Sequence, residues 1–205
     1  MLEAINLGCV RGDRQLFTNL NFLLEPGGLI EVRGPNGSGK TSLLRILCGL
    51  AAPAEGEVRW RSEDIRSLDE GYSGEIAYLA HQNGVKDELT AIENLRISSA
   101  LNGQALTKHE TQTFLERVGL ARCQELPARV LSAGQRRRLA LARLLAADAS
   151  VWILDEVMAS LDDAAVALSR EFISNHLNDG GMAIVATHQE LGLPASKTQR
   201  IDLRP

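Results

Sequence analysis

One stretch of the sequence orders glycine, lysine and threonine in the way that binding a polyphosphate demands. Residues 34 to 41 match the pattern GxxxxGK[ST] in full, between an expected strand and an expected helix. Glycines permit a tight turn in which backbone N–H groups converge on one anion, and the helix N-terminus adds partial positive charge. We predict that Lys40 reaches the terminal phosphates and that the Thr41 hydroxyl binds Mg²⁺. A glycine-rich turn with a chance Lys-Thr pair is the alternative. The predicted phosphate-binding residues are Gly34, Pro35, Asn36, Gly37, Ser38, Gly39, Lys40, Thr41 and Ser42.

A second stretch joins a buried strand to two carboxylates. Residues 151 to 154 are continuously apolar, and Asp155 and Glu156 follow them directly. Ligands of open α/β sheets bind at the carboxyl ends of the strands, so a nucleotide and its metal are expected at this tip. We predict that Asp155 holds Mg²⁺, directly or through water, and that Glu156 polarises an attacking water. A strand that ends in a solvated acidic turn is the alternative.

Gln82 and His188 each follow another expected strand, at the same edge of the sheet. We predict that Gln82 senses Mg²⁺ or the attacking water, and that His188 donates a hydrogen bond to the terminal phosphate. A lone histidine is more often structural or solvated. On spacing alone, each of the two positions therefore only suggests a role.

The elements that must position these residues alternate between short apolar strands and longer helical stretches. We expect strands over residues 29–33, 75–80, 151–154 and 182–186, which suit a parallel sheet covered on both faces, and a helix over 42–50. Near period-two spacing over residues 17–24 indicates an antiparallel layer, and residues 200–203 could add an edge strand.

The middle of the chain, from about residue 89 to 147, carries helical signals without strong strand candidates. We therefore predict an α/β fold in one domain over residues 1–205. Residues 1–86 and 150–205 form the nucleotide-binding core, and residues 87–149 form an inserted helical subdomain.

Composition excludes several classes of protein. The chain has 205 residues, of which 44 % are hydrophobic and 23 % charged, as in an ordinary globular protein. Its net charge of −4 gives no chain-wide basic surface, so we expect no nucleic-acid partner. Three scattered cysteines show no metal-binding spacing and indicate a reducing compartment. No apolar run approaches the roughly 20 residues of a membrane-spanning helix, so work at a membrane would require a partner already there.

The stretch Leu131-Ser-Ala-Gly-Gln135 resembles the LSGGQ signature of ABC transporter ATPases, with Ala133 replacing a glycine. It lies shortly before the Asp155–Glu156 strand, as in that family, and Ser132 can cap the helix that follows. A helix cap without a ligand is the alternative. We expect the charge run at residues 136–138 to form a solvated helix face.

The resemblance covers essentially the whole chain and implies a P-loop NTPase core of the ABC ATPase type. It also implies a head-to-tail homodimer with ATP and Mg²⁺ held between the subunits. Each signature, made of Ser132, Ala133, Gly134 and Gln135, would close over the partner's nucleotide. Asp162, in a Ser-Leu-Asp stretch that matches the family, would touch the partner subunit.

The chain departs from the family at two positions. Val157 stands where the family usually has proline after the glutamate, which loosens the backbone but removes no functional group. Arg11 falls at or near the position where the family commonly stacks an aromatic ring on adenine. A guanidinium plane can also stack on a base, so Arg11 is our candidate for that contact.

Within the family, several phrases look like the ATP-binding subunit of cytochrome c maturation systems, among them Trp152-Ile-Leu-Asp-Glu156 and His81-Gln-Asn-Gly-Val-Lys86. This likeness implies an ATPase on the cytoplasmic face of a bacterial inner membrane, with integral membrane permease subunits as partners. Its work would be tied to delivering heme to a periplasmic heme chaperone. Two alternatives stay open: a soluble ABC-type ATPase acting on another assembly, and an ATP-binding regulatory module with little turnover.

Overall fold

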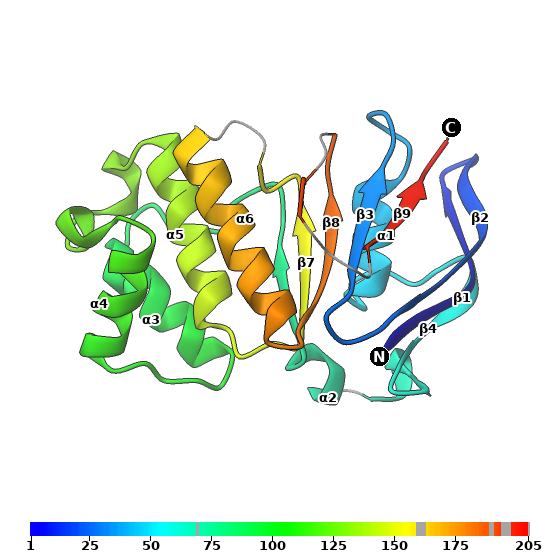
Figure 1. The fold of residues 1–205 in the computed structure, drawn as a ribbon, viewed down its shortest axis with the longest axis horizontal. Helices are drawn as coiled ribbons and strands as arrows, with labels where there is room; N and C mark the ends of the chain where they lie inside the picture. Colours follow the sequence, from blue (N-terminus) through cyan, green and yellow to red (C-terminus); the bar gives the residue numbers. More distant parts are fainter. Residues whose placement is uncertain (69, 159–162, 189–190, 194–197, 205) are drawn as a thin grey trace. The chain divides into compact units, whose positions relative to one another are not determined.

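The computed structural model describes residues 1–68, 70–158, 163–188, 191–193 and 198–204 (Figure 1). The chain divides into two compact units, each described by itself below. The first unit comprises Met1–Tyr78, Ala149–Val157 and Ile173–Pro205, and the second comprises Leu79–Asp148 and Met158–Phe172. Within the described residues, none of the helices combines the length and apolar character needed to cross a membrane.

An antiparallel sheet forms one layer of the first unit. Its strand order is β2-β1-β4-β5, with β1 at Leu2–Arg11, β2 at Arg14–Leu24, β4 at Glu55–Trp60 and β5 at Glu63–Asp64. Alternating apolar residues of β1 are buried, including Leu2, Ala4, Leu7 and Cys9, because one face of the sheet lies against the core. The predicted antiparallel layer over residues 17–24 is therefore confirmed, as the second half of a longer β2 strand.

A five-stranded sheet forms the other layer, in the order β6-β7-β8-β3-β9. Strands β7 (Val151–Asp155) and β8 (Met182–Ala186) pair in parallel and are buried along their whole length. Strand β3 (Leu29–Arg33) pairs in parallel with β8 and with the edge strand β9 (Thr198–Asp202), and β6 spans Ile76–Leu79. These strands confirm the predicted parallel sheet: β3 and β8 have the predicted ends, and the ends of the other strands differ by at most two residues.

Helical segments also belong to the first unit. Helix α1 (Lys40–Leu47) buries Leu43, Leu44 and Leu47 in the core of the first unit. It begins two residues earlier and ends three residues earlier than predicted, because Cys48 and Gly49 close it with a helical cap and a left-handed residue. Helix α2 spans Glu70–Ser73, and the 3₁₀ turn η1 spans Ile65–Ser67.

The second unit is built mainly from helices. Helices α3 (Ala91–Leu101), α4 (Lys108–Arg117) and α5 (Ala133–Ala146) pack on one another around Leu95, Leu115 and Leu139. The 3₁₀ turns η2 (Ala121–Cys123) and η3 (Ala128–Val130) connect α4 to α5. Helix α6 spans Asp163–Asn178 and belongs to the second unit up to Phe172 and to the first unit from Ile173.

Each of the helices α3, α4 and α5 begins with a capping box. In each, a serine or threonine side chain accepts a hydrogen bond from the backbone N–H three residues further on. The side chain of that later residue accepts a hydrogen bond from the backbone N–H of the serine or threonine. The pairs are Thr90 with Glu93, Thr107 with Glu110, and Ser132 with Gln135. These reciprocal bonds fix where the helices begin, so the sequence at the three positions sets the local fold.

Candidate nucleotide-binding site

The predicted phosphate loop runs from the end of β3 to the start of α1. Gly34 has a φ of 152°, and a Cβ there would lie 2.5 Å from the carbonyl oxygen of Leu203 and 2.5 Å from the Ser38 hydroxyl. Only glycine fits this position, because any side chain would collide with backbone. Helix α1 follows Gly39, which offers no side-chain cap, and its first turn holds no acidic residue. Its first amides are therefore available to an anion.

Lys40 lies at the start of α1 with its side chain only 5 % exposed. Its Nζ donates to the carbonyl oxygens of Gly34, at 2.9 Å, and Pro35, at 3.3 Å. It also lies 3.5 Å from a carboxylate oxygen of Glu156. The ammonium group thus lies folded over the loop, where a phosphate oxygen can compete with carbonyl oxygens for its protons.

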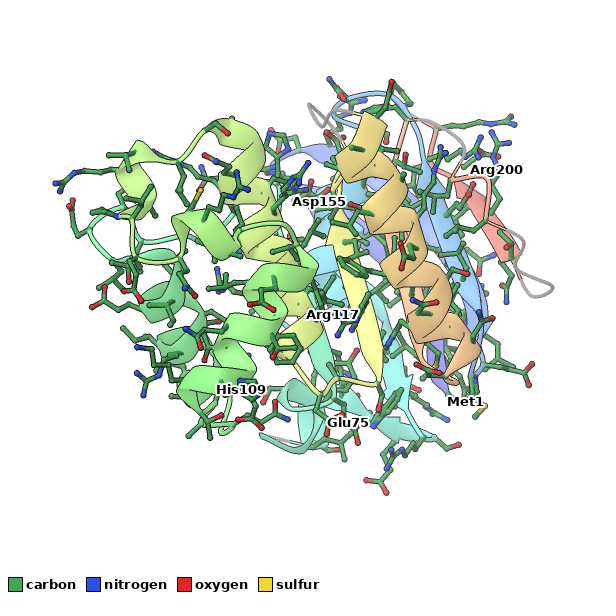
Figure 2. The ribbon with its side chains drawn as sticks, turned by 60° about the vertical axis from the view of Figure 1, so that its left-hand side comes forward. Met1, Glu75, His109, Arg117, Asp155 and Arg200 are labelled. Atoms are coloured by element: carbon green, nitrogen blue, oxygen red, sulfur yellow. The ribbon has the colours of Figure 1, made fainter. Side chains whose placement is uncertain are left out.

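Thr41 and Asp155 meet although 114 residues separate them. The Thr41 hydroxyl donates to the Asp155 carboxylate at 2.8 Å, at the end of β7 (Asp155 is labelled in Figure 2). Asp155 is 2 % exposed. A hydroxyl next to a carboxylate, both beside a phosphate loop, is the oxygen donor set that fits Mg²⁺ bound to a nucleotide. Among the described residues, no three or more His, Cys, Asp or Glu side chains form a group that could hold a metal ion by themselves.

Glu156 follows β7 with a left-handed backbone, at a φ of 52°. Its backbone N–H donates to the carbonyl oxygen of Ala186 at 3.0 Å, which ties this turn to the end of β8. One carboxylate oxygen lies 2.9 Å from Nε2 of His188, and that nitrogen lies 3.4 Å from Nζ of Lys40. A base, a cation and an imidazole therefore lie within hydrogen-bonding reach of one another at one sheet edge.

Ser38 has a buried hydroxyl that finds no hydrogen-bond partner within the described residues. Its side chain is 1 % exposed and lies inside the phosphate loop. A buried polar atom without a partner costs free energy unless a ligand or a water satisfies it. The loop therefore holds an unused hydrogen-bonding group beside the position where a phosphate fits.

The base-contact candidate Arg11 lies exposed at the end of β1, opposite Arg14 across the hairpin. Sequence reasoning missed two residues of β2 that lie next to the phosphate loop, Leu16 and Phe17. A Cβ on Gly39 would lie 3.1 Å from Cβ of Leu16 and 3.3 Å from a ring carbon of Phe17. The near period-two spacing over residues 17–24 predicted an antiparallel layer but not which segment its residues would contact.

In the second unit, the signature begins helix α5. The Ser132 hydroxyl accepts the Gln135 N–H at 3.2 Å, and the Gln135 side-chain oxygen accepts the Ser132 N–H at 2.9 Å. The Gln135 side-chain amide also donates to the sulfur of Cys123 at 3.3 Å, a contact that sequence reasoning missed. Ser132 and Ala133 are exposed, so the start of the helix is accessible to a ligand.

The charge run beside the signature corrects an expectation. Arg137 is only 6 % exposed, so residues 136–138 do not form a uniformly solvated face. Arg137 donates to the loop that follows β6, to the carbonyl oxygen of Ala80 and to the side chain of Asn83. Arg137 shares a face of α5 with the buried Leu141, one turn further on, which accounts for its burial.

The structure therefore brings together five of the predicted site residues within the first unit: Lys40, Thr41, Asp155, Glu156 and His188. Gln82 is exposed in the loop after β6, and it belongs with the signature residues to the second unit. Asp162 lies outside the described residues.

Comparison with known proteins shows what the chain resembles. Residues 17–159 match the family described as ABC transporter. The chain is 56 % identical over 202 residues to the cytochrome c biogenesis ATP-binding export protein CcmA of Nitrosospira multiformis, covering 98 % of both chains. It is 54 % identical over 191 residues to the protein of the same name from Nitrosomonas europaea, covering 93 % of this chain and 90 % of that one.

Solved structures agree with this likeness. An ABC transporter ATP-binding protein from Pyrococcus furiosus, described as putative, matches with a TM-score of 0.85 and 25 % identity, over 98 % of this chain and 96 % of that one. The cassette MJ0796, solved as a dimer in a post-hydrolysis state with ADP and Pi, matches with a TM-score of 0.79 and 25 % identity, over 92 % and 88 %. The α/β fold of the ABC ATPase type is thereby confirmed.

Proposed function

This chain belongs to the ABC transporter family, and we propose that it is the ATP-hydrolysing subunit of a membrane complex that serves cytochrome c maturation. The name of its relatives, cytochrome c biogenesis ATP-binding export protein, supports this proposal. The observation that carries the hydrolytic part is the cluster of Lys40, Glu156 and His188 beside the Thr41–Asp155 pair.

The phosphate loop binds the nucleotide in this proposal. Lys40 exchanges its carbonyl contacts for the terminal phosphates, and the first amides of α1 donate to the same oxygens. Thr41 and Asp155 hold Mg²⁺, which when bound neutralises part of the charge on the phosphates. Arg11 stacks on the base, and Leu16 and Phe17 pack against the phosphate loop at Gly39.

The two groups at the strand ends carry the chemistry. Glu156 turns from Lys40 towards a water and orients it for attack on the terminal phosphorus, because Lys40 is then paired with phosphate. His188, held at 2.9 Å by the same carboxylate, donates to the terminal phosphate. Gln82 contacts Mg²⁺ or the attacking water. As the water oxygen bonds to the terminal phosphorus, the bond from that phosphorus to ADP breaks, and release of inorganic phosphate then removes the contacts of His188 and Lys40 with it.

We further propose a head-to-tail homodimer that closes over two ATP molecules. The Ser132 hydroxyl can accept the Gln135 N–H and at the same time donate its own proton to a phosphate of the partner's nucleotide. Residues 87–149, as the signature subdomain, then act on the nucleotide bound by residues 1–86 and 150–205 of the other subunit, and Asp162 touches that subunit. The dimeric state of MJ0796 supports this arrangement.

The partners follow from the same premise. Integral membrane permease subunits receive the work of ATP hydrolysis, and the chain acts on the cytoplasmic face of the bacterial inner membrane. The task is the delivery of heme to a periplasmic heme chaperone. A nucleic-acid partner is not part of the proposal, because the chain carries a net charge of −4.

The substitution Glu156→Gln tests the hydrolytic role. It keeps the shape of the side chain but removes the charge, so we expect retained ATP binding, accumulation of an ATP-bound dimer, and phosphate release slower by about 100-fold or more. Phosphate release and dimer content by size-exclusion chromatography are the measurements. Glu116→Gln, at an exposed position of α4, is the matched control. Phosphate release at the wild-type rate in Glu156→Gln would contradict the role given to Glu156.

Co-purification separates the membrane proposal from its main alternative. The tagged chain, recovered from detergent-solubilised membranes, should carry integral membrane subunits with it. Recovery only with ribosomes or with DNA would instead favour a soluble ABC-type ATPase. A regulatory module with little turnover would show ATP binding with no phosphate release that depends on Glu156.

A further inference from the structure

The loop that contains Gln82 is held on both sides by arginines of helix α5. Arg137 is 6 % exposed, and its Nη1 donates to the carbonyl oxygen of Ala80 at 3.2 Å and to Oδ1 of Asn83 at 2.8 Å. Ala80 lies two residues before Gln82, and Asn83 lies directly after it. One buried guanidinium group therefore spans the loop across Gln82.

A second arginine, six residues further along α5, holds the next part of the loop. Nη1 of Arg143 donates to the carbonyl oxygens of Asn83, at 3.0 Å, and Gly84, at 2.7 Å. Its Nε donates to the Ser98 hydroxyl on α3 at 2.9 Å. Gly84 has a φ of 61°, and a Cβ there would lie 3.1 Å from Nη1 of Arg143. The loop approaches the guanidinium group so closely that a side chain at this position would crowd it.

Asn94, a buried residue of α3, fastens the following stretch of the same segment. Its side chain accepts the Lys86 N–H at 2.8 Å and donates to the carbonyl oxygens of Lys86, Leu89 and Thr90. From Ala80 to Thr90 the backbone is thus tied to two helices of its own unit. The side chain of Gln82 is exposed, although the backbone around it is held.

We propose that Arg137 and Arg143 are positioning residues of the ATPase reaction, which fix the Gln82 side chain for its contact with Mg²⁺ or the attacking water. The inference rests on the proposed function, since it takes from there the role of Gln82. A guanidinium group offers several donors in one rigid plane, so it can hold two carbonyl groups at a fixed separation. A lysine ammonium keeps the charge but not this geometry.

The arrangement also links the loop that carries Gln82 to the signature of the same subunit. Arg137 lies five residues after Ser132 on the same helix, so the loop that carries Gln82 and the helix that begins at the signature share one rigid support. Displacement of either part within this unit then displaces the other. A purely structural role would instead stabilise the unit without acting through Gln82.

A double-mutant cycle on the full chain with Mg²⁺ and ATP tests the proposal. We expect Arg137→Lys and Gln82→Ala each to lower kcat by about 10-fold, with KM for ATP changed by less than about twofold. If Arg137 acts through Gln82, the double variant loses no more than Gln82→Ala alone. Losses that multiply, to about 100-fold, would overturn the proposal, as would a wild-type kcat in Arg137→Lys.

A second test variant and a matched control complete the experiment. Asn83→Ala removes one acceptor of Arg137 without touching a buried charge, and it should lower kcat by about threefold, again without effect in the Gln82→Ala background. This variant serves if Arg137→Lys does not fold. Arg129→Lys is the matched control, since the Arg129 side chain is 62 % exposed and forms an ion pair with the exposed Glu88; it should keep kcat within about twofold.

Failure of this inference is distinguishable from failure of the proposed function. A wild-type chain that binds ATP but shows no phosphate release dependent on Glu156 contradicts the proposed function, and the inference falls with it. A wild-type chain with such release, together with multiplying losses in the cycle, contradicts the positioning role alone.

Discussion

Helices α1 and α5 begin in different ways, although neither has an acidic residue in its first turn. Helix α1 follows Gly39, which leaves the first amides uncapped. Helix α5 follows Ser132, whose side chain and that of Gln135 cap each other. The first helix start is therefore completed by an anion, whereas the second is already complete and presents a hydroxyl. In the proposed function, the start of α1 would contact phosphate through backbone amides and the start of α5 through the Ser132 hydroxyl.

The capping boxes of α3 and α4 differ from that of α5 in charge. Helices α3 and α4 have the same capping box, but with Glu93 and Glu110 where α5 has Gln135. Hydrogen bonds from the backbone and the hydroxyl of Thr90 lower the pKa of Glu93, so this carboxyl is ionised at neutral pH. A negative charge favours a helix start in isolation but would repel a phosphate. The glutamine keeps the cap and omits the charge.

The largest effect should come from a change to the backbone of the phosphate loop that leads into α1. Gly34→Ala places a methyl group 2.5 Å from backbone and from the Ser38 hydroxyl, so the loop must open. We expect ATP affinity to fall by about 100-fold or more, which corresponds to about 2.7 kcal/mol, in equilibrium binding of a fluorescent ATP analogue.

Gly37→Ala is the control within the same loop. It also has a positive φ, of 79°, but a Cβ there meets nothing within 4 Å. Its cost is backbone strain alone, about 1 kcal/mol, or roughly a fivefold loss of affinity at most. Equal losses in the two variants would break the claim that close approach, rather than turn conformation, makes Gly34 necessary.

The second effect should come from adding charge to the capped helix start. Gln135→Glu retains the capping box but places a carboxylate beside Ser132, so we expect ATP-dependent dimer formation and kcat to fall by about 10-fold or more. Size-exclusion chromatography with Mg²⁺ and ATP gives the dimer content. The reciprocal control, Glu93→Gln, changes the same position of α3 and should leave both quantities unchanged. A fully active Gln135→Glu would show that neutrality at this cap has no function.

The smallest expected effect is on the pH dependence of stability, to which a partly buried histidine of the first unit should contribute and an exposed histidine of the second unit should not. His176, in the first unit, stacks on Trp152 with ring centroids 4.0 Å apart, and burial lowers its pKa below the ordinary value of 6.5. Because the folded chain favours the neutral ring, its stability is full above about pH 6.5 and declines as the pH falls towards the lowered pKa. His109 of α4 is exposed (labelled in Figure 2).

Thermal unfolding from pH 7.5 to 5 checks this difference. His176→Gln should flatten the acid decline by about 0.5 kcal/mol or less, a value that allows for solvent screening at a partly exposed ring. His109→Gln should leave the pH dependence of the melting temperature as it is. An identical pH dependence in both variants and the wild type would contradict the assignment to His176.

The sequence predicted the strands and the residues at their ends because apolar runs and strand-end carboxylates are local patterns. Lys40, Thr41, Asp155 and His188 could be placed at one edge from those patterns alone. Contacts made across loops could not be predicted in this way. The arginine run at residues 136–138 looked like a solvated surface, since nothing in its spacing shows that Arg137 turns inwards towards Ala80. The pairing of Cys123 with Gln135 likewise depends on how two segments of the second unit pack.

The left-handed backbone of Glu156 has a consequence for efforts to make this protein more heat-resistant. Glutamate is poorly suited to a φ of 52°, whereas glycine and asparagine adopt that conformation with little strain. Screening random libraries for survival at high temperature would therefore enrich replacements at position 156, and, if Glu156 has the proposed role, the most heat-resistant variants would have lost ATP hydrolysis. Folding and turnover make opposite demands on this single position.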